Sequence, residues 1–375
     1  MTKNISIRNY SMVIALVLIW SFFGFLSPDF LTPRNLSELI IDLSITGVLA
    51  LGMFLILIPG QIDLSAGSGV GLIGGIASVL ISLHGVPPIL SLLIGFICGI
   101  LLWTIMGWII VKQEVPAFII TLGGLLIFKG LFWMVIQNST ISILNDGKEN
   151  IYSALTTFNL NPEVGASLSL LGFLALVFFS IKNQKQKKSF GFETEDKEIN
   201  FMKLFITGQL IFLFTLICNY SRGIPLSVVI LILSVIFVYI LTQFTVFGRY
   251  LYAIGGNSEA SFLSGIKVDN ILIGAYALMG FFVALSGYLQ TSFIGSSTTT
   301  IGNLMELDAI AACVIGGTSL KGGRGTVSGV LFGALIMVSL LNGMTLLAVS
   351  PEMKFIIRGF VLALAVWMDI KLSKK

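Results

Sequence analysis

The chain has 375 residues, of which 56% are hydrophobic and only 11% carry a charge. Soluble globular domains carry about 25% charged residues, so the composition excludes a soluble enzyme or binding domain and predicts a polytopic membrane protein. The net charge of +4 arises mostly from loop asymmetry and gives no reason to expect a nucleic-acid partner.

Apolar segments long enough to cross a membrane follow one another along almost the whole chain. A spanning helix needs about 20 apolar residues, and on this criterion we predict an all-α fold with about twelve transmembrane helices. Met305–Gly317 is the weakest, because it is short and begins with two carboxylates, so it is either a short crossing or a re-entrant helix. The predicted spans are Ser11–Leu26, Leu39–Ile58, Gly67–Leu83, Ile89–Val111, Ala117–Ile136, Gly165–Ile181, Phe201–Cys218, Leu226–Val246, Ile271–Gln290, Met305–Gly317, Thr326–Leu347 and Phe355–Ile370.

The distribution of Lys and Arg predicts the orientation of these spans. With the N-terminus inside, 16 of the 22 basic residues lie in cytoplasmic segments, 4 lie outside, and Lys129 and Arg358 lie within spans. Both termini are then cytoplasmic. If Met305–Gly317 did not cross, the basic residues that follow it would change sides.

Three polar segments interrupt the apolar pattern. In this topology Gln137–Val164 lies outside, whereas the insert Asn183–Asn200 lies inside, and its few apolar residues predict a mobile cytoplasmic loop. Phe247–Asn270 is also cytoplasmic and contains a double-glycine break before a short helical run over Asn257–Ser264. A short amphipathic helix between two spans can lie on the membrane surface or dock into a soluble partner.

Residue types that support catalysis or metal binding are scarce. His84 is the only histidine, which excludes a His-based triad or a multi-His metal site within one chain. Gly316–Thr326 is glycine-rich and basic, but it lacks the Ser or Thr that a phosphate-binding loop places after its lysine. The spacing of Cys98, Cys218 and Cys313 suits neither zinc nor a disulfide framework. We therefore expect no metal, no cofactor and no catalytic residue.

Charged residues at membrane depth are the sharpest signal in the chain. Lys129 lies well inside the fifth predicted span, where an ammonium group is costly unless it is paired, so we expect it to pair with Asp63, Glu306 or Asp308. Asp63 has a second reading, because it lies close to the start of the third span and could cap that helix near Ser65. The spacing favours the cap, since it requires no tertiary contact.

Four motifs, in this order, resemble the permease subunits of bacterial ABC sugar importers of the ribose, xylose and galactose type. They are PGQIDLSAGS (Pro59–Ser68), VPAFIITLGGLLIFKG (Val115–Gly130), FGRYLYAIGGNSEASFLSGI (Phe247–Ile266) and ELDAIAACVIGGTSLKGGRGTVSG (Glu306–Gly329). The resemblance covers nearly the whole chain. It implies a single permease domain over residues 1–375, similar to the type II importers, with a ten-helix core in the bacterial cytoplasmic membrane.

Within that family the chain is most similar to the xylose-type members. They share the extra hairpin Gly165–Tyr220 and a carboxyl-terminal segment like Asn342–Asp369. Two departures stand out: Lys129 occupies a position where arginine is usual, and the outer stretch Gly295–Asn303 is unusually rich in threonine.

The resemblance implies a function and a set of partners. Two permease chains would form the pathway for a monosaccharide, expected to be D-xylose, in contact with membrane lipid. An ATP-binding subunit would dock on the cytoplasmic face, and an extracytoplasmic sugar-binding protein would deliver the sugar. Phe247–Asn270 would be the coupling segment, and its expected contacts with the ATPase are Asn257, Glu259, Phe262, Leu263, Ser264 and Gly265. Pathway or structural charges are expected at Asp63, Lys129, Glu306 and Asp308.

Other functions are compatible with the same residues. Within the ABC class the cargo could be ribose, galactose or a nucleoside. An ion-coupled secondary transporter would also explain the spans and Lys129, but it would work without an ATPase. A sugar-sensing or structural membrane subunit would not transport at all.

Overall fold

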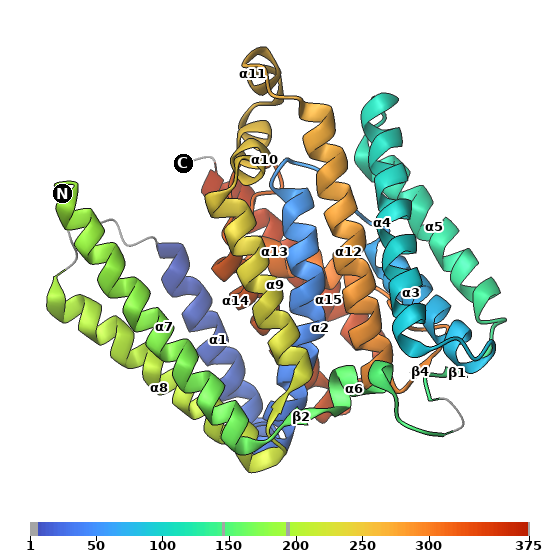
Figure 1. Ribbon diagram of the computed structural model, residues 1–375, viewed down its shortest axis with the longest axis horizontal. Helices are drawn as coiled ribbons and strands as arrows, with labels where there is room; N and C mark the ends of the chain where they lie inside the picture. Colours follow the sequence, from blue (N-terminus) through green and yellow to red (C-terminus); the bar gives the residue numbers. More distant parts are fainter. Residues whose placement is uncertain (1–6, 145–146, 193–195, 374–375) are drawn as a thin grey trace.

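The computed structural model describes residues 7–144, 147–192 and 196–373, which form fifteen helices and two pairs of two-residue strands (Figure 1). Strand β1 (Ile141–Ser142) pairs with β4 (Ser296–Ser297), and β2 (Asn159–Leu160) pairs with β3 (Ile224–Pro225). The helices are α1 (Ile7–Leu26), α2 (Pro33–Leu57), α3 (Ala66–Ser82), α4 (Pro88–Lys112), α5 (Ala117–Val135), α6 (Ile151–Thr157), α7 (Pro162–Ser189), α8 (Lys197–Ser221), α9 (Leu226–Phe244), α10 (Val246–Gly256), α11 (Ser258–Leu263), α12 (Val268–Ile294), α13 (Met305–Ile315), α14 (Val327–Leu346) and α15 (Pro351–Ser373).

The predicted helical membrane fold is confirmed, whereas the number of spans stays a prediction. Among the described residues, eight helices are long and apolar enough to cross a membrane: α2, α4, α5, α7, α8, α9, α12 and α14. The 11 residues of α13 give a length of only about 16 Å, against a hydrocarbon layer of about 30 Å. This helix therefore cannot cross alone, and a non-helical stretch leads into it from β4.

The helical bundle has two distinct ends, which serve as reference points below. Helices α10 and α11 lie at the upper end in Figure 1, which we call the α11 end. The short helix α6 and the strand pairs lie at the lower end, which we call the α6 end. The four helices that follow α1 run in alternating directions along the bundle (Figure 1). Prolines occupy the first turn of some of them, such as Pro33 of α2 and Pro88 of α4. Proline is favourable there because the N–H that it lacks would have no partner within the helix.

Two groups of four helices repeat one another with opposite direction. Helices α2 to α5 form the first group and α12 to α15 form the second. In Figure 1, α2 runs from the α6 end to the α11 end, and α12 runs the other way. Helix α12 packs on α4 as α2 packs on α14, and α3 packs on α4 and α5 as α13 packs on α14 and α15.

Each group contains one helix that begins inside the bundle after a non-helical stretch. These are α3 and α13, and the residues at their starts are similar: Asp63-Leu64-Ser65-Ala66 and Glu306-Leu307-Asp308-Ala309. The two starts meet where Gly67 and Gly302 are in contact, because a Cβ added at either glycine would collide with the other's carbonyl group. Gly302 also has a φ of +79°, which strains any other residue.

The hairpin formed by α7 and α8 lies at the edge of the bundle (Figure 1) and contacts it mainly through α2. The predicted cytoplasmic insert 183–200 is largely helical where it is described, because α7 extends to Ser189 and α8 begins at Lys197. The prediction of a loop was wrong for these residues, because Lys and Gln are good helix formers and here extend α7. Residues 193–195 of the predicted loop lie outside the described residues.

Candidate functional sites

Helix α11 is a short, well-capped helix at the α11 end of the molecule. The Asn257 side chain accepts a hydrogen bond from the Ala260 N–H over 2.9 Å and so caps the first turn. The Ser264 hydroxyl donates to the Ala260 carbonyl over 2.7 Å, and Gly265 ends the helix with a φ of +85°. These three residues, predicted as partner contacts, have a local role in shaping the helix.

The apolar residues of α11 face away from the protein. Leu263 is 85% exposed and Phe262 is 69% exposed, and Glu259 is exposed beside them. Together with Val268 and Asp269 they line a shallow hollow. Asp269 pairs with Lys112 at the end of α4 over 2.7 Å. These two neighbouring apolar side chains on a projecting helix make this hollow the candidate docking surface of the chain.

Helix α10 connects α11 to two stretches of chain, one that precedes α3 and one that follows α13. Its Gly255 packs against the Ile58 carbonyl and the Gly323 backbone, and the Gly323 N–H donates to the Ile58 carbonyl over 2.8 Å. The Tyr252 hydroxyl donates to the Gly325 carbonyl over 2.9 Å. Ile58 leads toward α3, and Gly323–Gly325 follows α13, so α10 contacts the chain next to both inner helices.

Asp63 is fully buried and all its described partners are local or on α4. Its Oδ1 accepts from the Ser65 N–H over 2.8 Å and from the Ser65 hydroxyl over 2.6 Å. Its Oδ2 accepts from Trp103 Nε1 over 2.6 Å. Asp63 therefore holds Ser65, the residue before α3, and ties it to α4. The predicted cap of α3 is not formed, because Asp63 bonds the N–H of Ser65 and not an N–H of the helix itself. The predicted alternative, an ion pair with Lys129, is not among the ion pairs of the described residues.

Asp308, near the start of α13, has a cationic partner that differs from the predicted one. Its Oδ2 lies 3.2 Å from Nη2 of Arg358 on α15, and the side chains are only 7% and 21% exposed. In the opposite group of helices, Thr121 of α5 donates to the Ile62 carbonyl just before α3, over 3.2 Å. Each inner helix start is thus held by its neighbouring helix, in one case by an ion pair and in the other by a hydroxyl group.

Lys129 and Glu306 lie near this junction. Glu306 is buried at 5% exposure, its carboxylate packs against Gly67, and it lies within Coulombic range of Asp308, Asp63 and Lys129. The Lys129 ammonium lies 5.5 Å from the centroid of the Trp133 ring. The structure therefore brings the four predicted charges into one region, and it adds Arg358, Trp103 and Trp133, which the sequence reasoning did not single out as partners.

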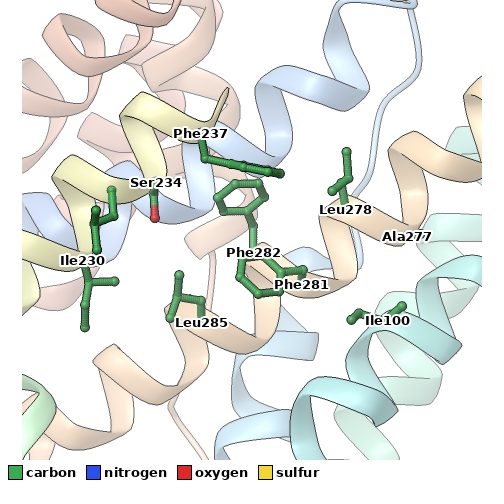
Figure 2. Close-up of a pocket in the computed structure, with 10 residues that line it drawn as sticks. Ile100, Ile230, Ser234, Phe237, Ala277, Leu278, Phe281, Phe282 and Leu285 are labelled. Carbon is green, nitrogen blue, oxygen red and sulfur yellow. The ribbon is translucent and has the colours of Figure 1, made fainter. Parts of the chain in front are cut away.

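A cavity of about 550 Å³ between α4, α9 and α12 has a different character (Figure 2). Its walls include Phe237, Phe281 and Phe282, and Ser234 contributes the one hydroxyl group of its lining. A sugar would lose most of its hydrogen bonds to water there without replacement. This cavity is therefore unsuited to a polar solute.

The contacts of Asp63 predict the effect of a subtle substitution. We expect Asp63→Asn to destabilise the protein by about 1–3 kcal/mol, because an amide NH2 must then face either Trp103 Nε1–H or the donors of Ser65. Adding Trp103→Phe removes one facing donor and should restore part of the loss, whereas Lys129→Met should restore nothing. Thermal unfolding of the purified protein measures both. An unaltered Asp63→Asn variant, or rescue by Lys129→Met, would contradict this assignment.

Comparison with known proteins relates the chain to transport systems. A family model described as "Branched-chain amino acid transport system / permease component" matches residues 35–366. The chain is 36% identical over 368 residues to the xylose transport system permease protein XylH of Escherichia coli (strain K12), covering 98% of this chain and 93% of that protein. XylH of Haemophilus influenzae is 35% identical over 374 residues, covering 100% and 99%.

Ribose permeases are also similar. The ribose import permease protein RbsC of Bacillus subtilis (strain 168) is 33% identical over 348 residues, covering 93% of this chain and 88% of that protein. No solved structure matches the chain. The match to the family model extends over the inner helices α3 and α13 and over α10 and α11.

Proposed function

The chain belongs to the family of transport-system permease components and is a multi-pass protein of the bacterial inner membrane, and from this premise we propose that it forms the pathway of an ATP-driven monosaccharide importer. In this proposal it is a non-catalytic subunit, and a separate ATP-binding subunit hydrolyses ATP. A second copy of the chain completes the pathway, and an extracytoplasmic sugar-binding protein delivers the cargo.

The observation that carries the proposal is the projecting helix α11 with its exposed Phe262 and Leu263. A groove on the ATP-binding subunit would cover these two side chains. Closure of the ATPase dimer would then move α11, and the contacts of α10 with Ile58 and Gly323 would pass that movement to α3 and α13. This is a rigid-body coupling between two separate sites.

The orientation follows from this role. The α11 end faces the cytoplasm, together with the end of α7, the start of α8 and the basic stretch around Lys321 and Arg324. The α6 end then faces the outside, where the strand pairs and α6 present a surface to the binding protein. Both chain termini are cytoplasmic, in agreement with the Lys and Arg asymmetry.

The proposed cargo is D-xylose. Two of the relatives compared above are named xylose permeases and share 35–36% identity with this chain over nearly its full length. The ribose permeases are less similar, at 31–34%, so ribose is the second candidate. Specificity in such systems also depends on the binding protein, and both sugars belong in the first experiment.

Reconstitution tests this function directly. The chain is purified with the ATP-binding subunit and the binding protein from the same organism, and all three are placed in proteoliposomes. We expect uptake of radiolabelled D-xylose that requires ATP and every component. Uptake by the chain alone, driven by a proton or sodium gradient, would instead identify a secondary transporter. Failure of the complete system to import any pentose or hexose would refute sugar transport.

A further inference from the structure

Building on the proposed function, we propose that Lys129, Trp133, Thr299, Thr300 and Asn303 form a weak binding platform for a neutral monosaccharide in the outer part of the pathway. We call these five residues the outer platform. They come from α5 and from the non-helical stretch between β4 and α13. Neither the family match nor the names of the relatives assigns a sugar contact to any of them.

The first argument is the position of the non-helical stretch. Ile301 and Gly302 lie against Gly71 and Gly67 of α3, so the stretch runs beside a membrane-embedded helix. Yet Thr300 and Asn303 on the same stretch are exposed. Irregular backbone at membrane depth is tolerated only where protein buries it or where it lines a water-filled cavity. The exposed side of this stretch is therefore not expected to face lipid, and in our proposal it faces the water of the pathway.

The second argument is that α5 shares this watery face. Trp133 Nε1 donates to the Thr299 carbonyl over 3.3 Å, which fixes the indole beside the stretch, and 40% of Trp133 remains exposed. Lys129 reaches along α5 to within 5.5 Å of the ring centroid. A Cβ added at Gly130, between them in sequence, would have no neighbour within 4 Å, so no other described part of the chain covers α5 at this position.

The third argument is chemical. A monosaccharide has an apolar face of C–H groups and an edge of hydroxyl groups, and it needs an amphipathic wall. Trp133 offers a flat ring, whose N–H is already used to hold it in place. The Lys129 ammonium and the Asn303 amide donate to hydroxyl oxygens, and the threonine hydroxyls both donate and accept. A small number of polar groups, partly open to solvent, gives weak binding. Transport requires weak binding, because the sugar must leave the site as well as enter it.

A second lysine–tryptophan pair in the chain provides an internal comparison. Lys371 lies 4.4 Å from the Trp367 ring centroid, in the last turn of α15. That pair has the arrangement of an ordinary membrane-interface anchor, with a lysine at a helix end. Lys129 differs because it lies six residues before the end of α5 at Val135, or about 9 Å inside it, and because a non-helical stretch lies beside it.

Cysteine labelling distinguishes a watery platform from a lipid-facing anchor. Gly130→Cys is prepared in a chain whose three native cysteines are replaced by alanine, and it is treated from outside with a membrane-impermeant methanethiosulfonate. We expect rapid labelling, slowed by high concentrations of D-xylose. Leu93→Cys on α4 is the control, because it is 52% exposed and also lies five residues from the outer end of its helix. Gly130→Cys that stays as unreactive as Leu93→Cys would overturn the platform.

Uptake provides the second test. We expect Trp133→Leu to lower the rate of D-xylose uptake per chain about tenfold, Trp133→Phe to keep most of it, and Trp367→Leu to leave it unchanged. Equal rates for Trp133→Leu and Trp367→Leu, at matched membrane levels, would contradict the proposal. The wild-type complex is measured alongside: if it imports no sugar, the proposed function fails, whereas normal wild-type uptake with unaffected variants rejects only the platform.

Discussion

The variant Leu263→Asp is expected to abolish sugar uptake while the chain still inserts and folds normally. Leu263 is 85% exposed at the tip of α11, so a carboxylate there costs nothing in the isolated chain. In the assembled importer the same side chain would be buried in the groove of the ATPase without a partner. An uncompensated buried charge costs about 3–5 kcal/mol, which corresponds to a loss of binding of more than about a hundredfold.

Three measurements define the result: the amount of chain in the membrane, the amount of ATP-binding subunit that co-purifies with it, and uptake in proteoliposomes. Phe190→Asp is the matched control, because Phe190 is also an exposed apolar residue, at 68%, but lies at the end of α7. We expect Phe190→Asp to retain uptake and the bound ATPase. Full uptake by Leu263→Asp would show that α11 is not the coupling helix.

The variant Arg358→Met should produce the largest loss of stability. It leaves the Asp308 carboxylate, which is only 7% exposed, without its cation at the start of α13. We expect the free energy of unfolding to fall by about 3–5 kcal/mol, seen as a lower thermal transition and a poor folded yield in detergent. The double variant Arg358→Met with Asp308→Leu removes both charges and should recover most of the loss.

An exposed ion pair within the same chain is the control for that experiment. Arg34 and Glu38 are one helical turn apart on α2, 3.5 Å from each other, with side chains 87% and 51% exposed. Surface pairs contribute about 0–1 kcal/mol, so Arg34→Met should change the unfolding transition little. If Arg358→Met were equally mild, the buried pair would not hold α13 in place.

The helices that cross the membrane were largely predictable because apolar runs and proline boundaries mark them. Ala117–Ile136 was predicted and α5 spans Ala117–Val135; Leu226–Val246 was predicted and α9 spans Leu226–Phe244. The sequence analysis allowed a re-entrant helix over Met305–Gly317, but it did not predict that α3 also begins inside the bundle, opposite α13. Glycines in apolar runs suggest close packing in general, but they do not say that Gly67 meets Gly302.

The partners of the buried charges were harder to predict than the charges themselves. Lys129 was the predicted partner of the buried carboxylates because it lies deep in an apolar run. The partner of Asp308 is instead Arg358, which lies fifty positions further along the chain. Sequence separation carries no information about such a contact. In a hydropathy pattern Trp103 is indistinguishable from the other apolar residues of α4. The hydrogen bond from its Nε1–H to Asp63 could therefore not be predicted from that pattern.

The pair between Asp308 and Arg358 also bears on biosynthesis. An aspartate at the centre of an inserting helix is opposed by about 2.5–3.5 kcal/mol at the translocon. Asp308 lies in the first turn of α13, and this helix is too short to compensate with apolar residues. Its neutralising arginine is made fifty residues later, which is roughly 3–10 s at ordinary rates of translation. A nascent chain that stops before α15 therefore holds an acidic, short helix with no counter-charge. We therefore expect α13 to reach its final position only after α15, which carries Arg358, has been synthesised.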